Sequence, residues 1–163
     1  MKLIAAVSKD WAIGNKGELL ISIPEDMKFF RTSTTGNVVI MGRKTLFSFP
    51  NQKPLKNREN IVITRDENFS CLGAIVVNSV EEAVKKAEEF SDKEIYVIGG
   101  ASIYEQMLKY CDTAYITYID YSYAADAYFP NLDKDPEWEL ANEDEEHTYF
   151  DVSYFYRVYK RVK

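Results

Sequence analysis

The segment Ile95-Tyr96-Val97-Ile98-Gly99-Gly100-Ala101-Ser102 decides the fold class of this chain. Its continuous apolar run is typical of a strand that is buried on both faces. The run leads through paired glycines into a helix, which is predicted from one apolar face made of Ile103, Tyr104, Met107 and Leu108. The glycines allow a ligand or a second backbone to approach closely, although a tight turn is the simpler reading of the pair in isolation. A strand that is followed by a helix in this way favours a parallel sheet, because parallel neighbours need a crossover connection.

Similar apolar runs recur on both sides of this segment. Further buried strands are predicted at Leu3–Val7, Val38–Met41, Ile61–Ile63, Ala74–Val77 and Ala114–Ile119. A second helix is predicted behind a Ser79 cap, because Val80, Ala83, Val84 and Ala87 keep helical spacing.

The C-terminal segment has a different period. Apolar residues alternate with mostly polar ones at Phe150, Val152, Tyr154, Tyr156 and Val158, which indicates an antiparallel strand with one buried face. We therefore predict an α/β fold with a mainly parallel central sheet, helices on both faces and an antiparallel strand at its C-terminal edge. In such sheets ligands bind at the carboxyl ends of the strands.

Length and composition place the chain among ordinary soluble proteins. Its 163 residues are expected to form one domain over 1–163. The apolar run at Leu3–Val7 is too short for a signal peptide or a membrane span. Cys71 and Cys111 fit no metal-binding spacing and allow at most one disulfide. A reducing, cytoplasmic setting is expected.

Charge is unevenly distributed along the chain. The net charge of −6 argues against general nucleic-acid binding. However, residues 28–65 contain eight basic residues and one acid, Glu59, whereas residues 133–146 contain eight acids and one lysine. The basic segment suggests an anionic ligand, and a solvated basic face remains an alternative.

One carboxylate is the strongest candidate for chemistry. In Ile23-Pro24-Glu25-Asp26-Met27-Lys28-Phe29-Phe30-Arg31, the proline suits a first helical turn. Ser22 and Glu25 have the spacing of a capping box. Asp26 and Phe30 are four residues apart and point the same way. Asp26 is therefore either a helix-end charge or a recognition group for a cationic, amidine-like ligand.

Several basic residues are candidates for binding an anion. The strand Val39–Met41 ends at Gly42, and a helix is predicted to open with Arg43, Lys44 and Thr45, an arrangement that suits an anion at the helix start. Residues 36–45 nearly match a phosphate-binding P-loop, although a surface turn explains them as well. Arg58 could pair with a carboxylate, and Arg65 follows the strand end at Thr64 and could bind a phosphate.

His147 is interpreted as a solvated loop residue. Because it is the only histidine, the sequence argues against a zinc site or a histidine-based triad.

Taken in order, short motifs along nearly the whole chain resemble dihydrofolate reductase. These motifs are Leu3–Ala6, Ile13-Gly14, Ile23–Met27, Val39–Thr45, Asn57–Val62, Val97–Tyr104, Tyr115–Thr117 and Tyr128–Pro130. The resemblance implies reduction of 7,8-dihydrofolate to 5,6,7,8-tetrahydrofolate with NADPH, by hydride transfer to pterin C6 and protonation of N5 through water. It also implies binding of antifolate inhibitors, a monomeric state, and no metal, nucleic-acid or membrane partner.

The resemblance further implies a role for each matching residue. Asp26 would bind the pterin N3 and 2-amino groups, Thr117 would support it, and Arg58 would hold the α-carboxylate of the glutamate tail. The walls of the substrate site would be Ile4, Ala6, Met27, Phe30, Phe49, Leu55 and Ile98. The phosphates of NADPH would contact Arg43, Lys44, Thr45, Thr64 and Arg65, with Thr64 and Arg65 reading the 2′-phosphate. The rest of the cofactor would contact Ala6, Ile13, Gly14, Gly42, Gly99, Gly100, Ala101, Ser102, Ile103 and Tyr104, with a cis peptide between Gly99 and Gly100.

The sequence departs from the family pattern in the lid. The loop 9–21, with Gly14 and Gly17 as hinges, resembles a lid over the nicotinamide, but Leu20-Ile21 replaces the usual Pro-Trp. Ala125-Asp126-Ala127 replaces Gly-Asp-Thr, which predicts a weaker contact between that loop and the lid. Two alternatives remain open on sequence: a reductase of the same fold acting on another pterin or a riboflavin-pathway pyrimidine, and a cofactor-binding protein without catalysis.

Overall fold

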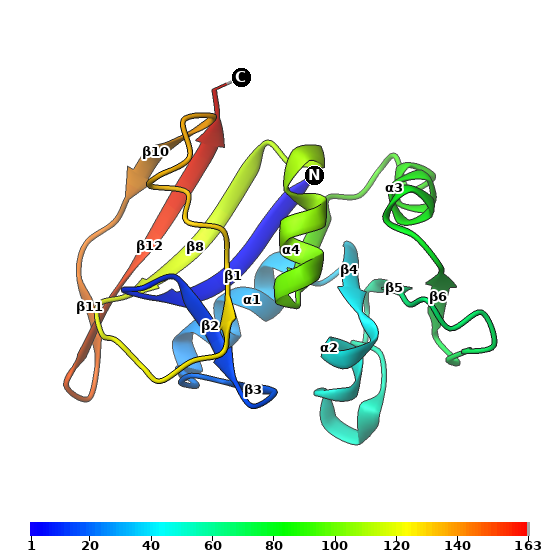
Figure 1. The fold of residues 1–163 in the computed structure, drawn as a ribbon, viewed down its shortest axis with the longest axis horizontal. Helices are drawn as coiled ribbons and strands as arrows, with labels where there is room; N and C mark the ends of the chain where they lie inside the picture. Colours follow the sequence, from blue (N-terminus) through cyan, green and yellow to red (C-terminus); the bar gives the residue numbers. More distant parts are fainter. Residues whose placement is uncertain (163) are drawn as a thin grey trace.

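The computed structural model describes residues 1–162 and is built on one large mixed sheet (Figure 1). The strand order is β10-β12-β8-β1-β7-β4-β5-β6, and β11 pairs with β12. The parallel strands are β1 (Lys2–Ser8), β4 (Val38–Gly42), β5 (Glu59–Ile63), β6 (Ala74–Val77), β7 (Ile95–Gly99) and β8 (Thr113–Ile119). The antiparallel strands are β10 (Trp138–Glu143), β11 (His147–Tyr149) and β12 (Val152–Arg161). The predicted fold class is therefore confirmed, except that β10 rather than β12 forms the C-terminal edge.

Helices cover both faces of the sheet. On one face, α3 (Val80–Glu88) and α4 (Ala101–Met107) bury Ala83, Ala87 and Met107. On the other face, α1 (Pro24–Thr34) and α2 (Arg43–Phe47) contribute Phe29, Phe30 and Leu46 to a second apolar cluster. In Figure 1, α4 lies in front of the sheet and α1 lies behind it. The short 3-10 turns η1 (Pro50–Gln52) and η2 (Leu108–Tyr110) follow α2 and α4. No helix within residues 1–162 is long and apolar enough to cross a membrane.

The helix starts were predicted with mixed success. The Ser79 hydroxyl accepts a hydrogen bond of 3.1 Å from the Glu82 amide, so the predicted cap of α3 is confirmed. The predicted capping box of Ser22 and Glu25 is wrong, because α1 begins at Pro24 and Ile23 is its N-cap without a side-chain bond. Ile23 is buried against Ile119 and Tyr154, so apolar anchoring rather than a polar cap sets this helix start.

The segment expected to be a loop over residues 9–21 contains a β-hairpin. Strands β2 (Ala12–Asn15) and β3 (Glu18–Leu19) are joined by a two-residue turn in which both Lys16 and Gly17 have positive φ. This is the geometry that two-residue hairpins prefer. A third strand, β9 (Ala127–Tyr128), pairs with β2 and completes a small second sheet.

Two other sequence predictions are wrong in detail, and the P-loop alternative is excluded. Gly36 precedes β4 and Gly42 ends it, so the two glycines lie at opposite ends of one strand and cannot form a P-loop. Phe150 lies outside β12, in the turn after β11, where it has a φ of 54° and is 85% exposed. His147 belongs to β11, is half-buried, stacks on Tyr154 and pairs with Asp144 at 2.8 Å.

Both faces of β12 are covered, although the alternation predicted only one. Tyr154 packs with Ile23 and Ile119, whereas Tyr159, five positions later and on the opposite face, is fully buried beside Trp11. Because β12 lies between β8 and β10, it behaves as an interior strand and needs apolar residues on both sides.

Candidate active site

Asp26 projects from the first turn of α1 towards β8. The Thr117 hydroxyl donates a hydrogen bond of 2.6 Å to Asp26 Oδ1. Thr117 lies opposite Ala6 in the pairing of β8 with β1, so the carboxylate sits over two central strands of the sheet. The structure therefore brings together two residues that are 91 positions apart in sequence and that were both predicted for the site.

The surroundings of Asp26 oppose its ionisation. Burial raises the pKa of the Asp26 carboxyl above its ordinary value, and the hydrogen bond from Thr117 offsets part of that rise. No ion pair to a cation within residues 1–162 compensates the carboxylate, because none of the described ion pairs includes Asp26. A cationic or hydrogen-bond-donating ligand would supply that compensation.

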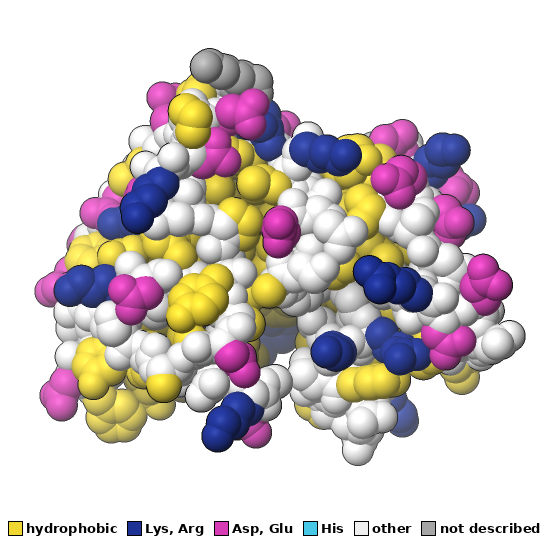
Figure 2. All heavy atoms as spheres, viewed as in Figure 1, with side chains coloured by type: hydrophobic (Ala, Val, Ile, Leu, Met, Phe, Trp, Pro, Cys, Tyr) yellow, Lys and Arg dark blue, Asp and Glu magenta, His cyan; other side chains and the backbone are white. Residues whose placement is uncertain are grey.

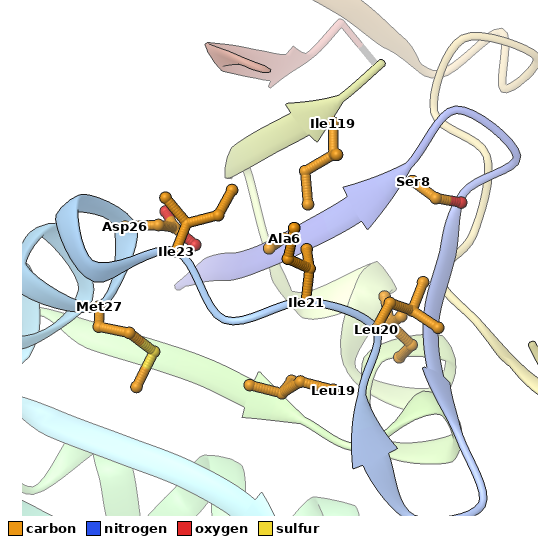
Figure 3. Close-up of a pocket in the computed structure, with 10 residues that line it drawn as sticks. Ala6, Ser8, Leu19, Leu20, Ile21, Ile23, Asp26, Met27 and Ile119 are labelled. Carbon is orange, nitrogen blue, oxygen red and sulfur yellow. The ribbon is translucent and has the colours of Figure 1, made fainter. Parts of the chain in front are cut away.

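A pocket opens beside Asp26, between α1 and the segment that follows β3 (Figure 3). Asp26 and Met27 come from α1, Ala6 from β1, and Ile119 from the end of β8. The remaining lining residues are Ser8, Ile13, Leu19, Leu20, Ile21 and Ile23. The Ser8 hydroxyl accepts bonds from the amides of Asp10 and Ala12, so it holds the turn after β1. Asp26 is thus the only titratable group in an otherwise mainly apolar lining.

A second set of predicted substrate residues lies in one apolar cluster. Ile4 and Ile98 are buried in neighbouring strands, and Phe30, Phe49 and Leu55 pack against the same cluster. Phe30 comes from α1, one helical turn after Asp26. These aliphatic and aromatic side chains can form the walls of a slot for a flat ring, with Asp26 at one end.

Arg58 lies near the far end of α1 from Asp26. Its guanidinium is 6.0 Å from the centroid of the Phe30 ring, and Nη2 donates a long bond of 3.4 Å to the Thr35 hydroxyl. Its Nε atom is buried and has no hydrogen-bond partner within residues 1–162. Burial, and then the nearby charge of Arg31, lowers the pKa of Arg58. A carboxylate ligand would satisfy the unpaired donor and relieve that cost.

The predicted cofactor residues meet at the carboxyl ends of three neighbouring strands. Gly42 ends β4 opposite Ile63 of β5, and Met41 lies opposite Gly99 of β7. Thr64 and Gly100 follow these strand ends directly, and Thr45 lies in α2, three residues after Gly42. The topology therefore brings together the residues 42–45, 64–65 and 99–104 that the sequence assigned to one site.

The paired glycines are packed closely at this edge. The peptide between Gly99 and Gly100 is cis, as expected, and Gly99 has a φ of 123°. A Cβ on Gly99 would lie 3.3 Å from the Tyr104 ring, and a Cβ on Gly100 would lie 3.6 Å from the Thr45 hydroxyl. The Tyr104 hydroxyl donates a bond of 2.7 Å to the Ile4 carbonyl, which fixes α4 against β1. Both β7 and α4 are thus tied to the strand that carries Ala6.

Several cations lie near α2, beside the carboxyl ends of β4 and β5. Lys44 and Arg65 are exposed and form no ion pair within the described part of the chain, whereas Arg43 pairs with Asp66 at 3.2 Å. Figure 2 shows a hollow between the β2–β3 hairpin and the α2 region, with Lys and Arg side chains gathered on the α2 side. Of the other predicted contacts, Ile13 lines the Asp26 pocket, Ser102 is exposed on α4, and Ile103 is buried against Gly42. No group of three potential metal ligands occurs within residues 1–162.

The β2–β3 hairpin, the segment expected to act as a lid, contacts the 125–127 segment. The Lys16 amide donates a bond of 3.0 Å to the Asp126 carboxylate, and the Asp126 amide donates to the Gly14 carbonyl. These bonds use backbone groups and the acid itself, so alanines at positions 125 and 127 preserve them.

The sequence did not single out several residues around Asp26. Ser8, Ile23 and Ile119 line the pocket, and Tyr156 lies opposite Thr117 and packs on Phe29 at 4.9 Å. A tyrosine at an inward-facing position of the last strand was read as core, and its pairing with Thr117 could not be seen before the register of β8 and β12 was known.

Comparison with known proteins agrees with this geometry. The family model for dihydrofolate reductase matches residues 1–161. The dihydrofolate reductase of Buchnera aphidicola (subsp. Acyrthosiphon pisum, strain APS) is 41% identical over 138 residues, which cover 85% of this chain and 83% of that protein. The enzyme of Staphylococcus haemolyticus is 31% identical over 167 residues, covering 100% of this chain and 96% of that protein.

A solved structure of a related protein has the same fold. Dihydrofolate reductase from Enterococcus faecalis, complexed with NADP(H) and RAB-propyl, superposes with a TM-score of 0.87 at 29% identity, covering 99% of this chain and 96% of that one. The motifs, the fold, the arrangement around Asp26 and these matches lead to one conclusion: the chain belongs to the dihydrofolate reductase family.

Proposed function

We propose that Asp26 is the pterin-binding carboxylate with which this chain reduces 7,8-dihydrofolate to 5,6,7,8-tetrahydrofolate. The observation that carries the proposal is the 2.6 Å hydrogen bond from Thr117 to a half-buried carboxylate that has no cationic partner within residues 1–162. The Asp26 carboxylate accepts hydrogen bonds from the pterin N3–H and 2-amino groups. Two charge-assisted bonds of this kind fix the orientation of the ring and bias its electron distribution.

The substrate extends from Asp26 towards Arg58. Met27, Phe30, Phe49 and Leu55 enclose the pterin and aminobenzoyl rings, with Ile4, Ala6 and Ile98 beneath them. Arg58 pairs with the α-carboxylate of the glutamate tail. The buried, unpartnered Nε of Arg58 supports this role, because a bound carboxylate supplies the missing acceptor.

Proton delivery to N5 is assigned to water. Asp26 is the only titratable side chain lining the pocket, and it is engaged at the other edge of the ring. Leu20 and Ile21 line the pocket where the usual family pattern has Pro-Trp, so no indole N–H orders a water there. The carboxylate of Asp26 raises the proton affinity of the ring from a distance, and the lid hairpin controls the entry of water.

NADPH supplies the hydride that dihydrofolate accepts at C6. The residues at the carboxyl edge fit such a cofactor, because paired glycines leave room beside Thr45, and Lys44 and Arg65 are cations without ion-pair partners within residues 1–162. Gly42, Arg43, Lys44, Thr45, Thr64 and Arg65 would hold the phosphates. Ala6, Ile13, Gly14 and residues 99–104 would hold the nicotinamide side.

The test is the loss of NADPH absorbance with purified protein, measured with and without 7,8-dihydrofolate. We expect oxidation that depends on dihydrofolate and is inhibited by an antifolate. Oxidation with another pterin or with a riboflavin-pathway pyrimidine, but not with dihydrofolate, would transfer the proposal to that substrate. NADPH binding without any oxidation would identify a non-catalytic binding protein.

The molecular setting is also a proposal. We propose that residues 1–163 act as one domain, as a monomer, in the cytoplasm. The central sheet joins strands from both ends of the chain, which supports a single folding unit. Cys71 and Cys111 are both free, which is compatible with a reducing compartment.

A further inference from the structure

Arg43 is held by three neighbours at the carboxyl edge of the sheet. Its Nη1 atom donates a bond of 3.2 Å to Asp66 Oδ2. Its guanidinium carbon lies 5.7 Å from the centroid of the Phe47 ring and 5.4 Å from that of Phe69. These contacts hold a rotamer-rich side chain in one position, and they direct its charge at an acid of the same protein.

Asp66 has a position that does not depend on Arg43. The Asp66 amide donates to the Thr64 hydroxyl at 3.2 Å, and Asp66 Oδ1 accepts a bond of 3.0 Å from the Asn68 amide. The turn after β5 thus fixes the carboxylate, and Oδ2 is left to face Arg43. Asp66 directly follows the basic segment 28–65.

The pair joins the ends of two strands within the proposed phosphate region. Arg43 follows Gly42 at the end of β4, and Thr64 follows Ile63 at the end of β5; Gly42 and Ile63 are direct neighbours in the sheet. In Rossmann-type dinucleotide sites, an acid hydrogen-bonds the ribose 2′-hydroxyl of NAD, whereas an arginine accommodates the 2′-phosphate of NADP. This chain places one of each in contact.

We propose that Asp66 competes with the 2′-phosphate of NADPH for Arg43 and thereby limits the preference of this chain for NADPH over NADH. The inference rests on the proposed function and adds one assignment to it: Arg43, which follows the strand end beside Thr64, contacts the 2′-phosphate together with Thr64 and Arg65. Binding of NADPH requires the pair to open and places a dianionic phosphate near a fixed carboxylate. NADH lacks that phosphate and meets neither cost. Asp66 is therefore a specificity-determining residue that acts through Arg43.

The test compares the dissociation constants of NADPH and NADH by calorimetric titration at low salt. In Asp66→Asn the amide oxygen can still accept from Asn68, so the turn is retained while the charge is lost. Because exposed ion pairs contribute at most about 1 kcal/mol, we expect NADPH to bind roughly two- to fivefold more tightly and NADH to change by less than about twofold. The gain shrinks as salt is added, because both partners are partly exposed.

Two controls separate this mechanism from a general charge effect. Glu67→Gln removes an adjacent exposed acid that has no ion pair within residues 1–162, and it should leave the preference unchanged. Arg43→Gln should weaken NADPH binding about tenfold or more, and adding Asp66→Asn to it should give no further gain.

Unchanged NADPH binding in Asp66→Asn, an equal gain for NADH, or an equal gain in Glu67→Gln would overturn the inference and leave the proposed function intact. Absence of NADPH binding by the unmodified protein would overturn both.

Discussion

Replacing Thr117 by valine removes the only hydrogen bond that a side chain within residues 1–162 donates to Asp26, while side-chain volume is nearly kept. A hydrogen bond to a charged acceptor contributes about 1.5–3 kcal/mol. That energy stabilises the carboxylate and not the neutral acid, so Thr117→Val raises the pKa of Asp26 further above its ordinary value. At a pH near or below the wild-type pKa of Asp26, where the ionised fraction of the variant is much smaller than that of the wild type, binding of a cationic diaminopyrimidine antifolate should weaken by up to roughly 10- to 100-fold.

The assay is calorimetric titration of that antifolate across a range of acid pH. Affinity falls as pH is lowered through the pKa of Asp26, and in Thr117→Val the fall should begin at a higher pH. Thr117→Ser is the matched control, because it retains the hydroxyl and should follow the wild-type curve. Equal affinities for the wild type and the valine variant at every pH would refute the role of this hydrogen bond.

Three other perturbations test separate parts of the structure. Asp26→Asn removes a carboxylate whose pKa is raised by burial. In the wild type, the native state therefore binds more protons than the unfolded state at any pH between the ordinary and the raised pKa of Asp26. The free energy of unfolding of the wild type consequently falls as pH rises through that window. Thermal unfolding should show the variant more stable at pH 7, by on the order of 2–4 °C in Tm, with the difference vanishing below the ordinary Asp pKa; equal melting curves at pH 7 would contradict the burial cost. Arg58→Leu should raise the KM for dihydrofolate about tenfold or more and leave NADPH binding unchanged, and an unchanged KM would remove Arg58 from the substrate site. Asp126→Ala removes the acceptor of the Lys16 amide, so hydrogen exchange at that amide should accelerate while amides of β8 stay protected; equal exchange would show that the hairpin does not depend on this bond.

The parallel strands could be predicted because the composition of each strand indicates its own conformation and burial. Runs such as Val38–Met41 and Ile95–Ile98 are apolar over their whole length, and only a strand buried on both faces needs that composition. Each is followed by glycine and a short helix, which fixes the crossover and places Gly42 and Gly99 at one edge of the sheet.

Features that depend on distant pairing could not be predicted in the same way. The β2–β3 hairpin is short and partly polar, and its support comes from Asp126, which lies 110 positions from Lys16. Phe150 continues the alternation of the last strand but occupies a turn with positive φ, since the register of β11 and β12 places the turn there.

The candidate site shows the same division. Asp26 was a candidate from its own helix, because a carboxylate lies there among aromatic residues; a helix-end charge explained it as well, and its role towards a pterin came from the family resemblance. Its partner Thr117 came from the family resemblance, since only the placement of α1 against β8 brings the two together. Asp66 gave no signal in sequence, because an acid in a turn is ordinary until its contact with Arg43 is known.

The central claim is that Asp26 acts on the pterin and not on the cofactor. The most direct measurement is the kcat/KM for 7,8-dihydrofolate in wild type and Asp26→Asn, taken together with the dissociation constant of NADPH for both proteins. In Asp26→Asn the side chain is uncharged, and an N–H donor replaces one of the two acceptor oxygens, so both charge-assisted bonds to the pterin are lost. We therefore expect kcat/KM to fall by about 100-fold or more, whereas the dissociation constant of NADPH should stay within about twofold. A kcat/KM within about threefold of wild type, or an equal loss of NADPH binding, would contradict the account.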